Sequence, residues 1–181
     1  MCNCYTQKQV CLMNRLRQLW EQHVYWTRFF IISTAANLGD LKFVTNRLLE
    51  NPKDFEKLLA SFYCRKIAEQ FEKLFTQHLL IASDLVNALK DNETDKANAA
   101  RQKWYENANE IACFLSSINP YWEKSRWDSM LKSHLKMTEK EATLRLEGKY
   151  EEDVKIFDKI ETEALEMADY MFCGISRQFL N

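Results

Sequence analysis

The residues best able to do chemistry in this chain are two histidines that recur in the same local context. His23 lies in the run Leu-Trp-Glu-Gln-His-Val, and His78 lies in the similar run Leu-Phe-Thr-Gln-His-Leu. Imidazole and carboxylate ligands together suit iron, zinc or manganese, and the cores of helical bundles commonly hold such ions. The repeated context indicates that the two histidines occupy equivalent places in the fold, where they could ligate one transition metal.

Two carboxylates are the first candidates to complete that metal site. His23 and Asp54 lie equally far from a predicted turn at 37–40, on either side of it. His78 and Glu110 lie almost equally far from a second predicted turn at 92–95. Residues equidistant from a tight turn lie at the same height in two antiparallel helices. Each predicted hairpin is therefore expected to set one histidine level with one carboxylate.

The ligand set stays open at two points. A break at Pro52 would shift the helix that follows, and Asn51 or Glu50 would then take the place of the predicted carboxylate. Glu161, on the apolar seam of the last predicted helix, is a candidate for a further ligand or for a hydrogen bond to one. The alternative to a metal site is that both histidines are hydrogen-bonded core residues. No Glu-x-x-His pair, the usual signature of di-iron bundles, accompanies either histidine.

The six cysteines give weaker signals. Cys2, Cys4 and Cys11 could bind zinc or act in redox chemistry, but a structural zinc site needs four ligands. These three also lie in or near residues 1–7, a terminus that we expect to fray. Because no signal peptide precedes them, reduced thiols in a cytoplasmic protein are the expectation. The other cysteines are interpreted as small apolar residues: Cys64, Cys113 and Cys173.

Helices must position these residues, because the composition disfavours a sheet. The chain has only three glycines and two prolines among 181 residues, too few for the frequent turns of a β fold. Apolar residues recur at helical spacing, and no segment alternates with period two. Helices are predicted over about 8–36, 41–63 with a break at 51–52, 65–90, 95–118, 124–135 and from 138 towards the C-terminus.

The predicted fold is all-α and forms a single domain over residues 1–181. Two similar helical hairpins, about 8–63 and 64–120, would pack as an up-down four-helix bundle built from an internal repeat. The remaining segment, about 124–180, would add a short helix and a long C-terminal helix to that bundle.

The C-terminal segment holds a third histidine. His134 repeats part of the local context after nearly the same interval that separates His23 from His78, but the short predicted helix would place it near a helix end. Thr138 and Glu141 have the spacing of a capping box, which predicts that the last helix opens there.

The charge balance and the apolar pattern argue against two classes of partner. With 25 basic and 26 acidic residues, the chain lacks the basic excess that binding to nucleic-acid phosphates requires. The most apolar stretch, 24–36, is short and contains Arg28, so no membrane span is predicted. The aromatic residues of this stretch, among them Tyr25 and Phe29, favour a helix buried on most sides or covered by a second copy in a homo-oligomer. The acidic residues of 151–169 are expected on a solvated face.

Two runs of sequence carry a resemblance: Leu-Trp-Glu-Gln-His-Val-Tyr-Trp-Thr-Arg at 19–28 and Ser-Ser-Ile-Asn-Pro-Tyr at 116–121. Through them the chain resembles small uncharacterised bacterial all-helical proteins, some of them labelled acetylglutamate kinase, over most of its length after about residue 15. The resemblance implies a ferritin-like bundle and carries no established activity. The kinase label does not fit, because an amino-acid kinase needs glycine-rich phosphate loops in an α/β body.

Two functions are therefore expected, and neither specifies a reaction or a substrate. The first is a metal-binding helical bundle. The second is a non-catalytic bundle that associates with itself or with a protein partner through the aromatic surface of its first helix. The expected metal ligands are His23, His78, Asp54, Glu110 and Glu161.

Overall fold

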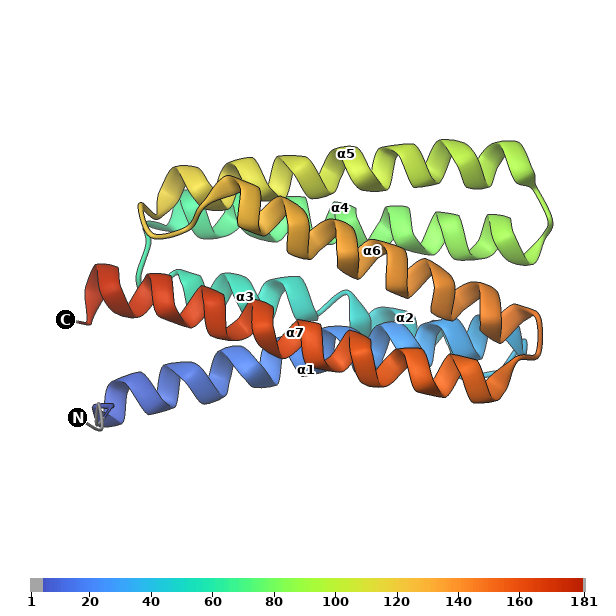
Figure 1. The fold of residues 1–181 in the computed structure, drawn as a ribbon, viewed down its shortest axis with the longest axis horizontal. Coiled ribbons are helices and arrows are strands. Elements are labelled where there is room, and N and C mark those ends of the chain that lie inside the picture. The colour runs from blue at the N-terminus through green and yellow to red at the C-terminus, as the bar shows by residue number, and fades with distance from the viewer. Residues whose placement is uncertain (1–4, 181) are drawn as a thin grey trace.

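The computed structural model describes residues 5–180, which form seven helices and no strand (Figure 1). This confirms the all-α prediction. No helix of this part of the chain is both long and apolar enough to cross a membrane. The helices are α1 (Gln7–Ala35), α2 (Leu41–Leu48), α3 (Asn51–Leu59), α4 (Arg65–Lys90), α5 (Thr94–Ile118), α6 (Lys124–Leu146) and α7 (Tyr150–Phe179).

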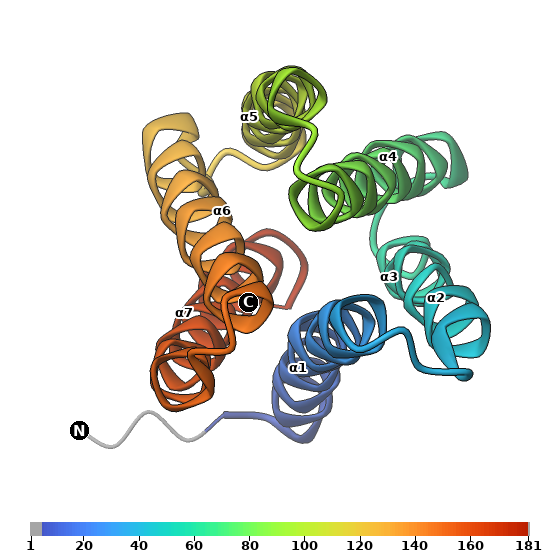
Figure 2. The same cartoon turned by 90° about the vertical axis from the view of Figure 1, so that its right-hand side faces the viewer.

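The helices pair into three antiparallel hairpins: α1 with α2 and α3, α4 with α5, and α6 with α7. The three hairpin turns lie at one end of the molecule, and both chain termini lie at the other (Figure 1). Viewed end on, the hairpins follow one another around a ring, which closes where α7 packs against α1 (Figure 2). The first helix of each hairpin also contacts the other two first helices, so α1, α4 and α6 line the centre.

The three hairpin turns share one backbone geometry. Asn37, Asn92 and Gly148 have positive φ angles of 52°, 58° and 74°. After each of them, the amide of the next residue donates a hydrogen bond of 2.9 Å to the carbonyl five residues earlier. This is the Schellman ending of a helix, which needs a residue that tolerates the left-handed conformation, as Gly and Asn do. The turns recur at nearly equal intervals along the chain, so the three hairpins have matching lengths.

The third hairpin differs from the sequence prediction. The short helix predicted over 124–135 is wrong, because α6 continues unbroken to Leu146. Thr138 and Glu141 do not cap a helix; both are buried in the interior of α6. The hairpin of α6 and α7 packs against both of the others, so it is a full part of the bundle rather than an addition to a four-helix unit.

The predicted break in the first hairpin is confirmed. α2 ends at Leu48 and α3 restarts at Asn51, with Pro52 in its first turn, where a missing amide proton leaves no hydrogen bond unmade. The restart points the Asn51 side chain into the core, where Asn51 is fully buried.

Large side chains close the centre on the side of the chain termini. Seven residues before each histidine stand Leu16, Phe71 and Trp127, each at most 1% exposed. Because seven residues are about two helical turns, these side chains form a layer parallel to the histidines. The histidines are thus sealed on this side by well-packed apolar residues.

Candidate functional site

Three histidines, one from each central helix, meet in the middle of the bundle. His23 of α1, His78 of α4 and His134 of α6 are 2–3% exposed. The ring centroid of His23 lies 6.4 Å from that of His78 and 5.5 Å from that of His134. His134 was expected near a helix end, but the full length of α6 places it inside the helix.

The sequence signal for the third histidine is its distance from the turn that follows it. The interval from the histidine to the left-handed residue of the turn is identical in all three hairpins. These intervals run from His23 to Asn37, from His78 to Asn92 and from His134 to Gly148. Equal intervals place the three histidines at one height above the turns, because all three central helices run in the same direction.

His78 is fully hydrogen-bonded. Its Nδ1 lies 2.9 Å from Oδ1 of Asn107, and the indole NH of Trp104 donates to its Nε2 at 3.2 Å. The amide group of Asn107 donates to the Leu74 carbonyl at 3.1 Å, which leaves its oxygen as the acceptor. Nδ1 of His78 therefore carries the proton and Nε2 accepts. Burial lowers the pKa of His78 to about 4, so the ring is neutral.

His134 stands opposite a carboxylate that sequence reasoning missed. Its Nδ1 lies 4.0 Å from Oε2 of Glu163 on α7, and neither atom has a hydrogen-bond partner within residues 5–180. Burial lowers the pKa of His134 to about 3, and burial raises the pKa of Glu163 to about 7. Glu163 occupies in the third hairpin the place that Asn107 has in the second, on the outer helix opposite the histidine.

His23 has the same kind of neighbour, and its bonding is also incomplete. Asn51 occupies the corresponding place in the first hairpin, and its amide group donates to the Leu19 carbonyl at 3.0 Å. Within the described chain, Oδ1 of Asn51 and Nδ1 of His23 have no hydrogen-bond partner. Burial lowers the pKa of His23 well below its usual value, and the two other histidines lower it further. Each hairpin thus carries an Asn or a Glu on the outer helix at the position opposite its histidine, and only His78 is hydrogen-bonded to that residue.

We call the three histidines and the residues opposite them the histidine layer: His23, His78, His134, Asn51, Asn107 and Glu163. Phe75 packs between two of its rings, with centroid distances of 4.8 Å to His23 and 6.0 Å to His78. Near the layer, two further buried donors, Nε1 of Trp20 and Oγ1 of Thr138, have no partner among the described residues. Unsatisfied buried polar atoms are rare in folded proteins and commonly mark a bound water or ion. The unpartnered atoms of the layer are therefore candidates for binding a water or an ion.

The three carboxylates predicted as ligands point elsewhere. Asp54 pairs with Lys57 at 3.3 Å and with Arg47 at 3.8 Å, Glu110 is exposed, and Glu161 accepts a hydrogen bond of 2.6 Å from the Tyr25 hydroxyl. Between residues 5 and 180, no group of three or more His, Cys, Asp or Glu side chains is arranged to hold a metal. The structure brings His23 and His78 together as expected, but not with these carboxylates. The physical reason in the first hairpin is the helix restart, which turns Asn51 rather than Asp54 inward.

The cysteines add no site. Cys2 and Cys4 lie outside the described residues. The other four are free thiols; Cys11, Cys64 and Cys173 are exposed and Cys113 is half-buried.

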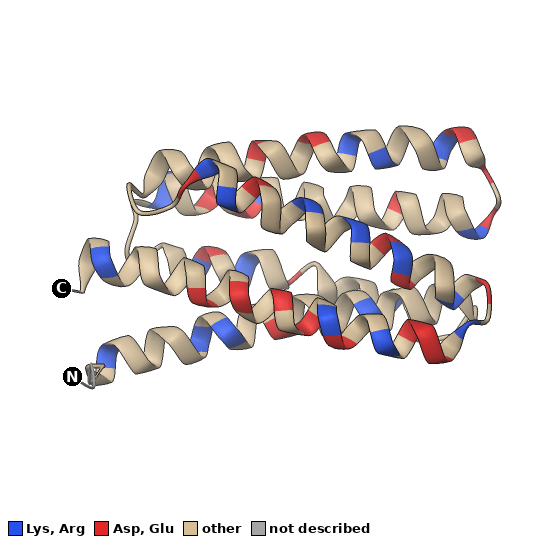
Figure 3. Cartoon of the chain, in the orientation of Figure 1, with Lys and Arg blue, Asp and Glu red and all other residues tan. Residues whose placement is uncertain are grey.

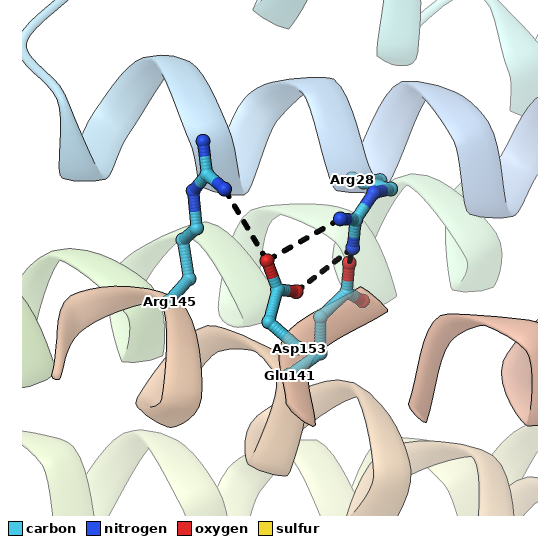
Figure 4. A network of polar contacts seen from close by, with 4 residues as sticks. All are labelled: Arg28, Glu141, Arg145 and Asp153. Carbon is cyan, nitrogen blue, oxygen red and sulfur yellow. Dashed lines mark hydrogen bonds and ion pairs between the residues drawn. The ribbon is translucent and has the colours of Figure 1, made fainter. Parts of the chain in front are cut away.

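A second buried polar cluster ties α1 to the start of α7 (Figure 4). Arg28 donates to Glu141 at 2.6 Å and to Asp153 at 2.8 Å, and Arg145 reaches Asp153 at 3.3 Å. Asp153 is fully buried, so its predicted place on a solvated face is wrong. Burial raises the pKa of Glu141 to about 7, although Arg28 beside it acts to lower that pKa. We call these four residues the ion-pair cluster.

Acidic and basic residues are interspersed along the helices, and acidic residues gather along α7 (Figure 3). Tyr25 and Phe29 on α1 are 38% and 43% exposed. The Tyr25 ring also packs at 5.4 Å on Phe157 of α7. Self-association through this aromatic face stays a prediction.

Comparison with protein-family models, with curated proteins and with solved structures finds no match. The resemblance carried by residues 19–28 and 116–121 therefore stays an expectation.

Proposed function

We propose that this protein binds a transition-metal ion in the histidine layer, with His134 and Glu163 as its first two ligands and His23 as the third. The observation that carries the proposal is the open pair of His134 Nδ1 and Glu163 Oε2, which are 4.0 Å apart without other partners within residues 5–180. The proposal keeps one histidine of the sequence prediction and replaces its carboxylates with Glu163.

The spacing of the open pair suits an ion between the two atoms. Metal–nitrogen and metal–oxygen bonds of about 2.0–2.2 Å set two ligand atoms roughly 3–4 Å apart, depending on the angle at the metal. The pair at 4.0 Å is at the upper end of this span, so a small side-chain movement would close it. A mixed histidine and carboxylate set favours iron, zinc or manganese.

His23 is the third ligand in this proposal because its ring lies 5.5 Å from that of His134 and its Nδ1 has no partner in the described chain. The three side chains are not already arranged around one point, so binding requires them to converge on the ion. His78 is not a ligand in this proposal, since Asn107 and Trp104 already occupy both of its nitrogens. Its closed pair instead holds α4 against α5 beside the site.

We further infer that the three hairpins are variants of one repeated unit. Asn51 and Asn107 bond equivalent carbonyls, of Leu19 and Leu74, on the central helix of their own hairpin. In the third unit Glu163 takes this place and can supply the negative charge that a divalent ion requires. The repeat therefore supports the proposal that the third hairpin supplies the charged ligand of the metal.

Metal titration of the purified, untagged protein tests the proposal. We expect about one equivalent of Zn²⁺ or Mn²⁺ to bind, and Glu163→Gln to weaken binding at least about tenfold, because the charged ligand is lost. Glu161→Gln on the same helix is the matched control and should bind like the wild type. Binding that Glu161→Gln, Asp54→Asn or Glu110→Gln weakens, and Glu163→Gln does not, would return the site to the carboxylates predicted from the sequence. Less than about a tenth of an equivalent of any transition metal would refute metal binding altogether.

A further inference from the structure

A small cavity lies beside the histidine layer. It measures about 20 Å³, counted as the space open to the centre of a water molecule, and lies between α1, α2, α4, α5 and α6. Thr27, Ala82 and Thr138 line it, and each of them follows a histidine of the layer by four residues. Since four residues are about one helical turn, the cavity adjoins the layer on the side of the hairpin turns.

The cavity wall is mostly apolar. Its two threonines differ in hydrogen bonding. The Thr27 hydroxyl donates to the His23 carbonyl at 2.8 Å, whereas Oγ1 of Thr138 has no partner among residues 5–180. Thr138 is 4% exposed, so bulk water does not satisfy this hydroxyl. The NH of Trp104, also in the wall, is bonded to His78. Two more polar residues reach the wall and both have partners: the Glu139 carboxylate accepts a hydrogen bond of 2.7 Å from Arg101, and the Ser83 hydroxyl accepts one of 3.4 Å from Asn87. The apolar wall residues are Phe30, Leu48, Leu79, Leu85, Val86, Leu89 and Ala142.

The size and the polarity of the cavity restrict what it can hold. About 10–15 Å³ on this measure is enough for one water molecule, but a buried water needs two to four polar partners. The wall offers one buried hydroxyl without a partner among the described residues, which is too few for a water, and cavities with apolar walls stay dry and accept apolar guests. An uncharged molecule of one or two heavy atoms meets both conditions.

We propose that this cavity binds a small apolar molecule of the size of dioxygen. The guest would pack against the Leu and Val side chains of α4, and the Thr138 hydroxyl would contact it at one end. Binding of the guest does not require a metal. Its meaning for a reaction rests on the proposed function, because the cavity lies one helical turn from His23 and His134.

Xenon is the probe for the first experiment, carried out by ¹²⁹Xe NMR on metal-free protein. We expect a saturable shift from one site in the wild type. Ala82→Leu should abolish it by filling the cavity, whereas the same change at Ala35, half-buried and outside the wall, should leave it intact. Thr138→Val keeps the side-chain shape and should retain xenon. Thermal melting of each variant verifies that it is folded.

The second experiment replaces xenon with dioxygen under pressure. Paramagnetic relaxation should select the methyl groups of Leu79, Val86 and Thr138, and it should disappear from the same methyl groups in Ala82→Leu. A non-saturable xenon shift, an equal shift in Ala82→Leu, or a resident water that xenon does not displace would each overturn the proposal. Because no metal is present, these outcomes are independent of the titration that tests metal binding.

Discussion

The two buried polar clusters of this bundle are built on opposite plans. In the ion-pair cluster, two arginines meet two carboxylates, and the bonds join α1, α6 and α7. In the histidine layer, the rings are neutral, and Nδ1 of His23, Nδ1 of His134 and Oε2 of Glu163 have no partner in the described chain. The first cluster is a set of ion pairs and is closed, whereas the second has neutral histidine rings and is open.

The difference separates a structural role from a functional one. Removing one member of a buried ion pair is strongly destabilising, so the closed cluster is held in place by its own energetics. An unsatisfied buried polar atom costs about 1–3 kcal/mol, so folding alone does not explain the open layer. This contrast is why we propose metal binding in the histidine layer and treat the ion-pair cluster as a contact that holds helices together.

Arg28→Met is expected to have the largest effect. It leaves Glu141 and Asp153 buried, with only Arg145 near them, and should lower the free energy of unfolding by about 3–5 kcal/mol. Chemical denaturation measures this loss. Arg17→Met is the control, since Arg17 pairs with Asp169 while 43% exposed and should lose less than about 1 kcal/mol. Equal losses in the two variants would show that the buried ion-pair cluster contributes no more to stability than an exposed ion pair.

Two tryptophans test the bonding of the histidine layer. Trp104→Phe removes the donor to Nε2 of His78 and should cost about 1–3 kcal/mol beyond the change in ring size. Trp20→Phe is the matched control, because Trp20 is equally buried and its NH has no partner within residues 5–180. Denaturant titration of both variants should therefore give the larger loss for Trp104. The reverse order would contradict the description of a closed second hairpin and an open first one.

The buried histidines should respond to pH in the opposite direction to the two buried glutamates, Glu141 and Glu163. The lowered pKa values of the histidines mean that the unfolded chain binds more protons below about pH 6.5, so their contribution to stability is lost as the pH falls. The raised pKa of Glu141 has the opposite sign: its contribution is present at low pH and lost as the pH rises towards about 7. Glu141→Gln removes this opposing contribution.

In Glu141→Gln, stability should therefore fall more steeply on acidification, by about 1 kcal/mol per pH unit between about pH 5 and 6.5. Unfolding free energies measured across this range for the variant and the wild type give the two slopes. Parallel slopes would mean that Glu141 is ionised in the folded protein throughout.

The smallest effect is expected at the surface. Tyr25→Phe removes the hydrogen bond to Glu161 at an exposed site, where water replaces the lost partner, and should change stability by less than about 0.5 kcal/mol. Thermal melting is sufficient to detect a larger change. A loss comparable with that of Trp104→Phe would show that an exposed hydrogen bond contributes as much to stability as a buried one, contrary to our expectation.

Local patterns predicted most of the fold. Apolar spacing and turn residues gave the helices up to Ile118, including the break at Pro52, because these depend on neighbours along the chain. The prediction failed at Thr138 and Glu141, whose spacing imitates a capping box. Glu141 bonds Arg28, which is distant in the sequence, and no local pattern reveals such a partner.

The site was predicted only in part. The sequence identifies His23 and His78 because histidine is rare in this chain and these two share a local context, whereas equal distance from each turn predicts Asp54 and Glu110 as the carboxylates. Glu163 is not predicted as a ligand, because a short helix over 124–135 would not form a hairpin of the same length as the other two. Its signal was a regular interval, since the step from Asn51 to Asn107 equals the step from Asn107 to Glu163.

Because α1 packs against α7 and closes the ring, the fold does not depend on which hairpin comes first in the chain. Gln9 donates to Ser176 at 3.0 Å and the Tyr5 ring lies 5.5 Å from that of Phe172, so the first and last helices are already joined side by side at one end. A short linker between them, with a new opening between α3 and α4, would give a circular permutant that starts at α4 and keeps every helix contact. In such a chain the middle hairpin would be the one that carries Glu163.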